Sequence, residues 1–289
     1  MNRRGFRCFH RLRVRWAEVD VQKIVFNAHY LTYADCAVAD YWRALALPYE
    51  ASMRVLGGDI YLKKASVEYH ASARLEDWLD IGIRCARVGV SSMVFEVAMF
   101  CGERLLVSVE LVYVFADPCT QTKREVPPAL RALLAHYEAG GEMVELRLAD
   151  WASLERDAAA LRSAVFVHEQ GVAQELEWDA HDALSLHVVA YNRLGLPVAT
   201  GRLLPAEGGV GRIGRMAVEH ALRGQRRGRQ ILDALVQAAR ARGDAAVLLH
   251  AQCHAQVFYQ RAGFVPEGEV FDEAGIAHIA MRLALQRQT

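Results

Sequence analysis

The stretch Trp16-Ala-Glu-Val-Asp20-Val-Gln-Lys-Ile-Val-Phe26-Asn-Ala-His29-Tyr30 separates two different hydrophobic patterns. Before it, Leu12–Trp16 alternates arginines with apolar residues, as a half-buried strand does. After it, apolar side chains recur at helical spacing from Tyr30 to about Leu45 and cover much of the circumference, which predicts a buried helix that ends before Pro48. The stretch is therefore expected to be the turn that leads from a strand into a central helix.

Behind this helix the hydrophobic pattern changes to a period of two. Four segments read as strands, each bounded by glycine or polar residues: Ile60–Tyr69, Trp78–Val88, Ser92–Phe100 and Leu105–Phe115. One buried helix followed by antiparallel strands predicts an α+β domain in which a sheet wraps the helix. A chain of 289 residues is long enough for two domains, and Gly140-Gly141 offers a flexible break. We therefore expect one domain at residues 1–139 and a second at 144–289.

The second half has a mixed α/β pattern with a strand–loop–helix unit in its middle. A strand at Val144–Leu148 precedes a helix at Leu154–Val165. Further on, the strand Gly211–Val218 leads through a basic loop into a helix at Gln230–Ala241, and Ala246–Ala251 follows as a buried strand.

The overall charge and the cysteines narrow the class of protein. The 34 basic and 34 acidic residues give a formal net charge of zero, so no global field draws the chain to nucleic acid or to a membrane. No apolar run is long enough to span a bilayer. The six cysteines occur singly, without metal-ligand spacing. We therefore expect a cytoplasmic protein with reduced thiols and with no metal, nucleic-acid or membrane partner.

Asp20 is the carboxylate of the opening turn, and a helix start follows it. The free N–H groups of a helix start can polarise a thioester carbonyl, and a nearby carboxylate can attack that carbonyl or activate a water. An aspartate in a turn is, however, more often an Asx-turn or capping residue. Residue types alone leave both interpretations open.

This segment resembles the signature of the 4-hydroxybenzoyl-CoA thioesterase family of hotdog proteins, including its YbgC and FadM branches. The resemblance covers about Arg11–Ala116, with Glu18 at the first Asp of the pattern and Lys23 where many members have Gly. It implies a hotdog fold, hydrolysis of an acyl-CoA thioester and a homo-oligomer whose sites form across a subunit interface. It also implies Asp20 as the catalytic nucleophile or base, and a carbonyl-polarising N–H near Asn27. The implied substrate-binding residues are Phe26, Asn27, His29 and Tyr30, although His29 is equally compatible with a surface or interface role.

The second candidate site is the basic loop Arg223-Gly-Gln-Arg-Arg-Gly228-Arg229, which opens a predicted helix. Backbone N–H groups, the helix dipole and arginines together form an anion site, for which a pyrophosphate is a natural ligand. Four arginines in seven residues are also compatible with a solvated face or a nucleic-acid patch. Net neutrality and the absence of interleaved aromatic residues disfavour nucleic acid.

The loop resembles motif A of the GNAT superfamily, with Arg223 and Gly228 at its ends and Arg226 at the internal glycine, where the ElaA-like branch carries a basic residue. The backbone at Arg226 must avoid a positive φ or accept it at a cost. Gln252–Phe264 resembles motif B, and the two motifs imply a GNAT fold over about Leu146–Leu285 with acetyl-CoA as co-substrate. Tyr259 falls on the position of the general acid that protonates the departing CoA thiolate, although a tyrosine on a short helix is often a core residue. The implied cofactor-binding residues are Met216, Ala217, Val218, Arg223, Gly224, Gln225, Arg226, Arg227, Gly228, Arg229 and Gln252.

The acceptor implied by this resemblance is an amine. Five residues could bind or deprotonate it, or could serve as caps, ion-pair partners or surface residues: Glu169, Asp179, Asp182, His187 and His278. The leading hypothesis is a bifunctional enzyme that hydrolyses an acyl-CoA and transfers acetyl from acetyl-CoA to an amine. The alternatives are that one domain is catalytic and the other is a scaffold or sensor, or that the protein is a non-catalytic, acyl-CoA-binding regulator.

Overall fold

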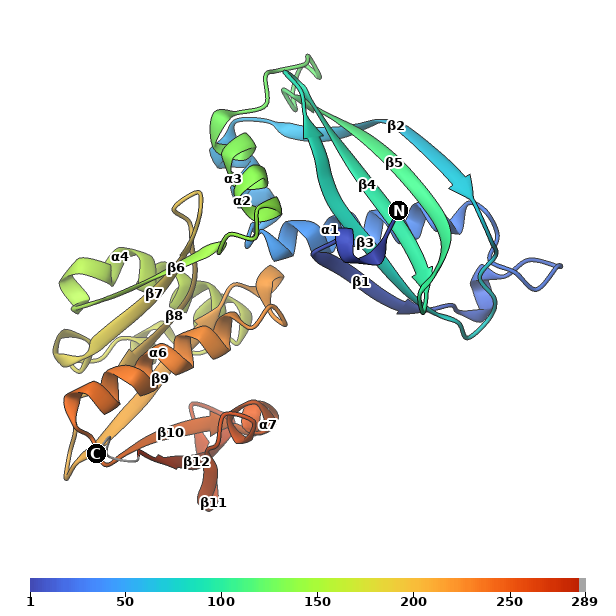
Figure 1. Cartoon of the computed structure of the whole chain (residues 1–289). Helices are drawn as coiled ribbons and strands as arrows, with labels where there is room; N and C mark the ends of the chain where they lie inside the picture. The colour runs from blue at the N-terminus through green and yellow to red at the C-terminus, as the bar shows by residue number, and fades with distance from the viewer. Residues whose placement is uncertain (286–289) are drawn as a thin grey trace. The chain divides into compact units, whose positions relative to one another are not determined.

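The computed structural model describes residues 1–285 and forms two compact units, Met1–Met143 and Val144–Thr289 (Figure 1). Gly140 ends the last helix of the first unit in a left-handed conformation, with φ at 89°. The division falls a few residues later, between Met143 and Val144. Each unit has its own sheet and its own buried residues.

The first unit is a five-stranded antiparallel sheet with a long helix along one face (Figure 1). The sheet order is β1-β3-β4-β5-β2, so β2 lies at an edge. The expected antiparallel sheet around a central helix is confirmed. The elements are β1 (Cys8–Arg13), α1 (His29–Ala44), α2 (Tyr49–Leu56), β2 (Asp59–Tyr69), β3 (Trp78–Val88), β4 (Ser92–Cys101), β5 (Arg104–Ala116) and α3 (Pro128–Glu138).

Helix α1 packs on the sheet through residues spaced three and four apart. The Tyr41 ring meets the Phe95 ring of β4 edge-on, with centroids 5.4 Å apart. The prediction of a helix buried on most sides holds for one side only in the single chain, because Leu31 is 39% exposed. The buried side consists of Tyr30, Tyr33, Ala34, Ala37, Val38, Tyr41 and Trp42.

The second unit is a seven-stranded mixed sheet in the order β11-β12-β10-β9-β8-β7-β6. All neighbouring strands are antiparallel except β9 and β10, which α6 connects. This agrees with the expected mixed α/β domain. The elements are β6 (Val144–Ala149), α4 (Trp151–Arg162), α5 (Gln174–Glu177), β7 (Leu186–Asn192), β8 (Pro197–Leu203), β9 (Val210–Val218), α6 (Arg227–Arg242), β10 (Ala246–Gln252), α7 (Gln256–Gln260), β11 (Val265–Glu273) and β12 (Ile276–Ala284).

Two helices differ from the sequence prediction. The helix expected at Leu154–Val165 begins earlier, because the Asp150 carboxylate accepts the Ser153 N–H at 3.0 Å and caps it. It ends at Arg162 and continues as a π-helical segment, Ser163–Glu169. Helix α6 also begins earlier than expected, at Arg227, within the basic stretch Arg223–Arg229.

Over residues 1–285, no helix combines the length and the apolar character that a membrane crossing requires.

Candidate functional sites

Strands β9 and β10 pair over only part of their length. Val210–Ile213 faces Ala246–Leu249, and no further pairing joins the two strands within the described chain. On the other side of β9 the register with β8 shifts between Thr200 and Arg202, and Arg215 adopts a φ of 51° at this irregularity. The two strands therefore part beyond Ile213 and Leu249, and the side of β9 that faces β10 keeps unpaired backbone groups.

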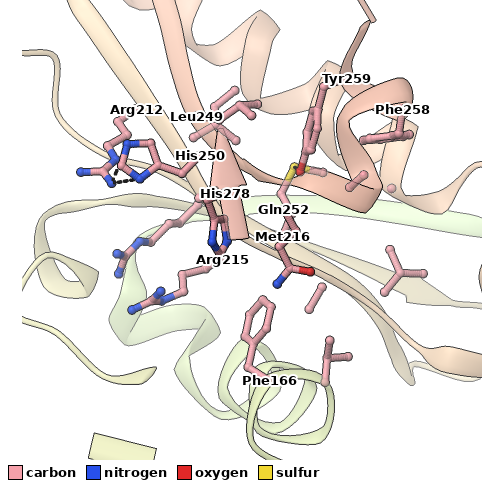
Figure 2. Close-up of a pocket in the computed structure, with 18 of the residues that line it drawn as sticks. Phe166, Arg212, Arg215, Met216, Leu249, His250, Gln252, Phe258, Tyr259 and His278 are labelled. Carbon is pink, nitrogen blue, oxygen red and sulfur yellow. Dashed lines mark hydrogen bonds between the residues drawn. The ribbon is translucent and has the colours of Figure 1, made fainter. Parts of the chain in front are cut away.

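A cavity of about 1730 Å³ occupies this opening (Figure 2). It is lined by the second half of β9, the end of β10, the basic loop, α7 and part of the π-helical segment. Its volume exceeds the roughly 300–1,000 Å³ typical of a pocket for one small ligand. The cavity is therefore large enough for two reactants.

The basic loop lies at one end of the cavity and presents the start of α6 to it. Arg226 caps the helix in a left-handed conformation with φ at 60°, so the chain accepts the positive φ that the sequence allowed as one alternative. Arg223 is bound by Glu169 through two hydrogen bonds of 2.6 and 2.7 Å, and Arg229 by Asp233. Arg226 is exposed and has no ion pair within residues 1–285. The helix start and Arg226 together offer the N–H groups and positive charge that suit an anion.

Ten of the eleven predicted cofactor-binding residues line this cavity. The exception is Gln225, which does not line it. The ten are Met216, Ala217, Val218, Arg223, Gly224, Arg226, Arg227, Gly228, Arg229 and Gln252.

Tyr259 on α7 lies beside β9 in the same cavity. Its hydroxyl donates to the Met216 sulfur at 3.7 Å, and its ring packs edge-on against Phe258 and Phe264 (Figure 2). Burial raises the pKa of Tyr259 to about 12. The hydroxyl is therefore protonated at neutral pH and has a proton to give to a departing thiolate.

A buried ionic network holds the segment between the π-helical turn and β7. Arg162 binds Glu177 and Asp182, with 2.7 Å between its Nη1 and the Asp182 Oδ1. Arg202 on β8 binds the same Asp182 oxygen at 2.6 Å. Three arginines face three carboxylates here, since Arg215 and Asp179 complete the network. These arginines were not predicted as site residues, although an arginine such as Arg202 within an apolar strand signals a buried partner.

The three predicted acidic acceptor residues are all engaged in ion pairs. The hydrogen bonds from Arg223 hold the pKa of Glu169 below its usual value. Burial alone would raise the pKa of Asp179, but Arg202 and then Arg215 outweigh it and bring the pKa down to about 2. Asp182 is 4% exposed and does not line the cavity.

The two predicted acceptor-side histidines lie in different environments. His187 is 1% exposed, does not line the cavity and has its Nε2 2.9 Å from the Asp182 carbonyl oxygen. Burial lowers the pKa of His187. His278 lines the cavity, with its Nδ1 2.7 Å from the Ile276 carbonyl oxygen (Figure 2).

In the first unit, Asp20 lies half-buried in the turn before α1. Its Oδ1 accepts the Gln22 N–H at 2.8 Å, and its own N–H donates to the Ile24 carbonyl at 2.9 Å. The aspartate therefore forms an Asx-turn and retains a second carboxylate oxygen. Lys23, at the position of the pattern's glycine, adopts a φ of 62°.

Glu18, at the first acidic position of the pattern, is buried and holds the turn together. Its carboxylate binds Arg15 and accepts the Tyr33 hydroxyl at 2.7 Å. Burial opposes ionisation, but the bonds from Arg15 and Tyr33 outweigh it and lower the pKa of Glu18. Glu18 therefore stabilises the loop that carries Asp20.

The predicted substrate residues lie around the start of α1. The N–H groups of Asn27 and Ala28 have no backbone acceptor within residues 1–285, and Phe26 is 47% exposed with its ring edge towards His29. Tyr30 differs, because it is buried and its hydroxyl accepts the Ala73 N–H at 3.0 Å. Asp20, Phe26 and the two N–H donors thus lie in the segment that leads into α1, and Tyr30 lies in the first turn of that helix.

Metal-ligand clusters are a further kind of site, and residues 1–285 contain no group of three His, Cys, Asp or Glu side chains that could hold an ion.

Comparison with known proteins assigns each unit to a family. Residues 152–285 match the acetyltransferase (GNAT) domain model, and residues 22–108 match the thioesterase superfamily model. Protein ElaA of Escherichia coli (strain K12) is 38% identical over 125 residues, which are 42% of this chain and 81% of ElaA. The chain belongs to the ElaA-like GNAT family through its second unit. Its first unit is a hotdog domain of the thioesterase superfamily, so the chain is a fusion of the two.

Two solved structures are similar to one unit each. An acyl-CoA N-acyltransferase from Pseudomonas aeruginosa is 36% identical, with 49% of this chain and 99% of that chain covered and a TM-score of 0.45. A thioesterase from Thermus thermophilus, complexed with coenzyme A and zinc, is 22% identical, with 48% and 98% covered and a TM-score of 0.42.

Proposed function

We propose that the ElaA-like unit transfers the acetyl group of acetyl-CoA to an amine. The observation that carries this proposal is the cavity where β9 and β10 part, because it joins an anion site to a protonated tyrosine. The N–H groups at the start of α6, with Arg226, would hold the pyrophosphate of CoA. The unpaired edge of β9 would hydrogen-bond the extended pantetheine arm. Tyr259 would protonate the thiolate that leaves when the amine attacks the thioester carbonyl.

Tyr259→Phe tests this proposal, with Tyr191→Phe as the control. Tyr191 lies in the same unit but outside the cavity, where its hydroxyl donates to Asp157. Tyr259→Phe should bind acetyl-CoA like wild type in calorimetry and lose about 10²–10⁴-fold in acetyl transfer, the usual range for a general acid. Wild-type protein that fails to bind acetyl-CoA would overturn the proposal.

We also propose that the hotdog unit hydrolyses an acyl-CoA thioester. Asp20 would act as nucleophile or base through its second carboxylate oxygen, and the Asn27 N–H would stabilise the oxyanion. The exposed ring of Phe26 would contact the acyl group, and His29 would line the same opening. Tyr30 would support this turn from below through its bond to Ala73.

Asp20→Asn is a sharp test of this second activity. The asparagine oxygen can still accept the Gln22 N–H, so the turn is preserved and only the charge is removed. Free CoA is measured over a panel of acyl-CoA esters, with Asp35→Asn on the exposed side of α1 as the control. Equal release by wild type and Asp20→Asn would refute hydrolysis by this site.

We propose that the hotdog unit forms a homo-oligomer through strand β2. This strand is at the sheet edge and exposes Leu62 and Tyr69, at 51% and 52%. An exposed edge strand with apolar side chains is a template for pairing with a second copy. Light scattering on the purified chain should give at least a dimer mass, and a monomer would refute this assembly.

The two activity assays also separate the alternatives. Wild-type protein with only one of the activities would make the other unit an acyl-CoA-binding scaffold or sensor. A cytoplasmic location is part of the proposal, in keeping with six cysteines that are all unpaired.

A further inference from the structure

The proposed acetyl transfer requires a base that the acidic residues do not supply. An alkylamine is an ammonium ion at neutral pH and must lose a proton before it can attack a carbonyl. Glu169 and Asp179 are paired with arginines and have lowered pKa values. A carboxylate that arginines hold in its ionised form is a poor proton acceptor.

His278 lies opposite the point where the strands part. In the register of β10 and β12 it is the direct partner of Gln252, the last residue of β10. Directly opposed residues of an antiparallel pair have their Cβ atoms about 4.5–5.5 Å apart on the same face. Gln252 in turn donates to Gln170, which directly follows the π-helical segment, at 3.0 Å. Figure 2 shows His278 in the cavity with Gln252 and Met216.

The hydrogen bonds of His278 select the tautomer that a base needs. Its Nδ1 is 2.7 Å from the Ile276 carbonyl oxygen, which can only accept. The neutral imidazole must therefore carry its hydrogen on Nδ1, which leaves a lone pair on Nε2. Nε2 has no hydrogen-bond partner within residues 1–285. The Phe271 ring stacks on the imidazole at 6.2 Å and 25°, which fixes the plane of the ring.

His250 also lines the cavity, but charged side chains already contact its ring. Its Nδ1 lies 2.8 Å from the Glu273 carboxylate, and the Arg212 guanidinium lies 2.9 Å from the same nitrogen and 3.4 Å from Nε2. Both ring nitrogens of His250 therefore have a charged neighbour, unlike the His278 Nε2. His250 therefore serves as the matched control for His278.

We infer that His278 is the catalytic base of the ElaA-like unit, an inference that rests on the proposed acetyl transfer. The ammonium form of the acceptor gives one proton to Nε2, and the amine lone pair forms the N–C bond at the thioester carbonyl. The tetrahedral intermediate then collapses with cleavage of the C–S bond. Tyr259 protonates the thiolate and regains a proton from the nitrogen of the new amide. The products are the amide, CoA and one proton, which His278 releases to solvent.

The experiment compares the full-length wild type with His278→Gln and His250→Gln. The probes are 2-phenylethylamine, spermidine, Nα-acetyl-lysine and hydroxylamine, with CoA release as the readout. His278→Gln should bind acetyl-CoA normally and lose about 10²–10⁴-fold in transfer to the alkylamines at neutral pH. Hydroxylamine is unprotonated at neutral pH and needs no base, so its acetylation should fall by much less.

The pH dependence separates a base from a structural residue. Other titratable or charged groups also face this part of the cavity: Glu273 on β11, His250 on β10, and Arg212 and Arg215 on β9. The comparison therefore depends on the protonation of the amine probe and not on that of these groups. Transfer by His278→Gln should rise about tenfold per pH unit and approach wild type near pH 10, as the alkylamine loses its own proton. A structural residue would lower transfer to every probe equally at every pH.

Three results would overturn the inference. The first is His278→Gln activity within about threefold of wild type, well below the effect of a general base. The second is an equal loss with hydroxylamine and the alkylamines. The third is nitrogen-15 NMR of the histidine-labelled chain in which neutral His278 carries its hydrogen on Nε2. Wild-type protein that transfers to no probe would count against the acetyltransferase proposal itself, and the tautomer would then decide the inference about His278.

Discussion

Arg162→Met is predicted to destabilise the ElaA-like unit strongly. The Arg162 side chain is 1% exposed, binds Glu177 and Asp182, and also donates to the Glu177 carbonyl at 2.8 Å. Methionine keeps an unbranched apolar stem but leaves each carboxylate with one cation fewer. Asp182 keeps Arg202, and Glu177 keeps Arg215 at 3.5 Å. Removing one partner of a buried pair costs about 3–5 kcal/mol, because the network is left with three carboxylates and only two arginines.

Calorimetric melting of the full chain measures this effect. In a unit of this size, 1 kcal/mol lowers Tm by about 3–4 °C, so we expect a fall of about 9–20 °C. Acetyl-CoA identifies the relevant transition, because a ligand raises the Tm only of the unit that binds it. The control is Arg156→Met on the same helix, where the side chain is 93% exposed and Tm should not change. A fall of less than about 3 °C for Arg162→Met would refute the view that this network stabilises the unit.

Three further predictions concern pH and backbone conformation. The pKa of Asp179 is lowered to about 2, so its contribution of about 1–2 kcal/mol is complete above its ordinary pKa of 3.8 and is lost as pH falls through 2. Asp179→Asn should therefore flatten the acid dependence of Tm, and an unchanged pH profile would contradict the assignment. Arg226→Gly should relieve the left-handed strain and leave Tm unchanged or slightly raised, while acetyl-CoA affinity in calorimetry falls by about 3–10-fold. Unaltered affinity would remove Arg226 from the anion site. Lys23→Gly should leave the stability of the hotdog unit unchanged or raise it by up to about 1 kcal/mol, whereas Lys23→Val should lower it. The melting temperature of the unit measures both changes. The reverse order would contradict the positive φ at Lys23.

The sequence predicted the elements that local periodicity reports. The spacing of apolar residues from Tyr30 onwards indicates which side of the helix is buried. The helix expected from Tyr30 to Leu45 is α1, at His29–Ala44. The basic loop could be placed before a helix from its glycines and arginines, and ten of the eleven residues expected to bind the cofactor line one cavity. Those assignments depend on residues close together in the chain.

The choice of base could not be predicted, because it depends on partners that are distant in sequence. Glu169 and Asp179 are suitable bases by residue type. Arg223 lies 54 residues from Glu169, and Arg202 lies 23 residues from Asp179. No local sequence pattern therefore predicts these ion pairs. The role of His278 depends on its register with Gln252 and on the Ile276 carbonyl, which only the pairing of β10 and β12 defines.

Lys23 in the hotdog unit and Arg226 in the ElaA-like unit share a left-handed backbone conformation. Each has a positive φ, of 62° and 60°, at a position where the related sequence pattern has glycine. A residue with a Cβ in this conformation costs about 1–2 kcal/mol, a large share of the stability of a small domain. A phosphate of CoA within reach of Arg226 would offset this cost with a contact of about 1.5–3 kcal/mol. The Arg226→Gly variant should then gain stability and lose CoA affinity together. Stability gained without any loss of affinity would show that the strain at that position serves no CoA contact.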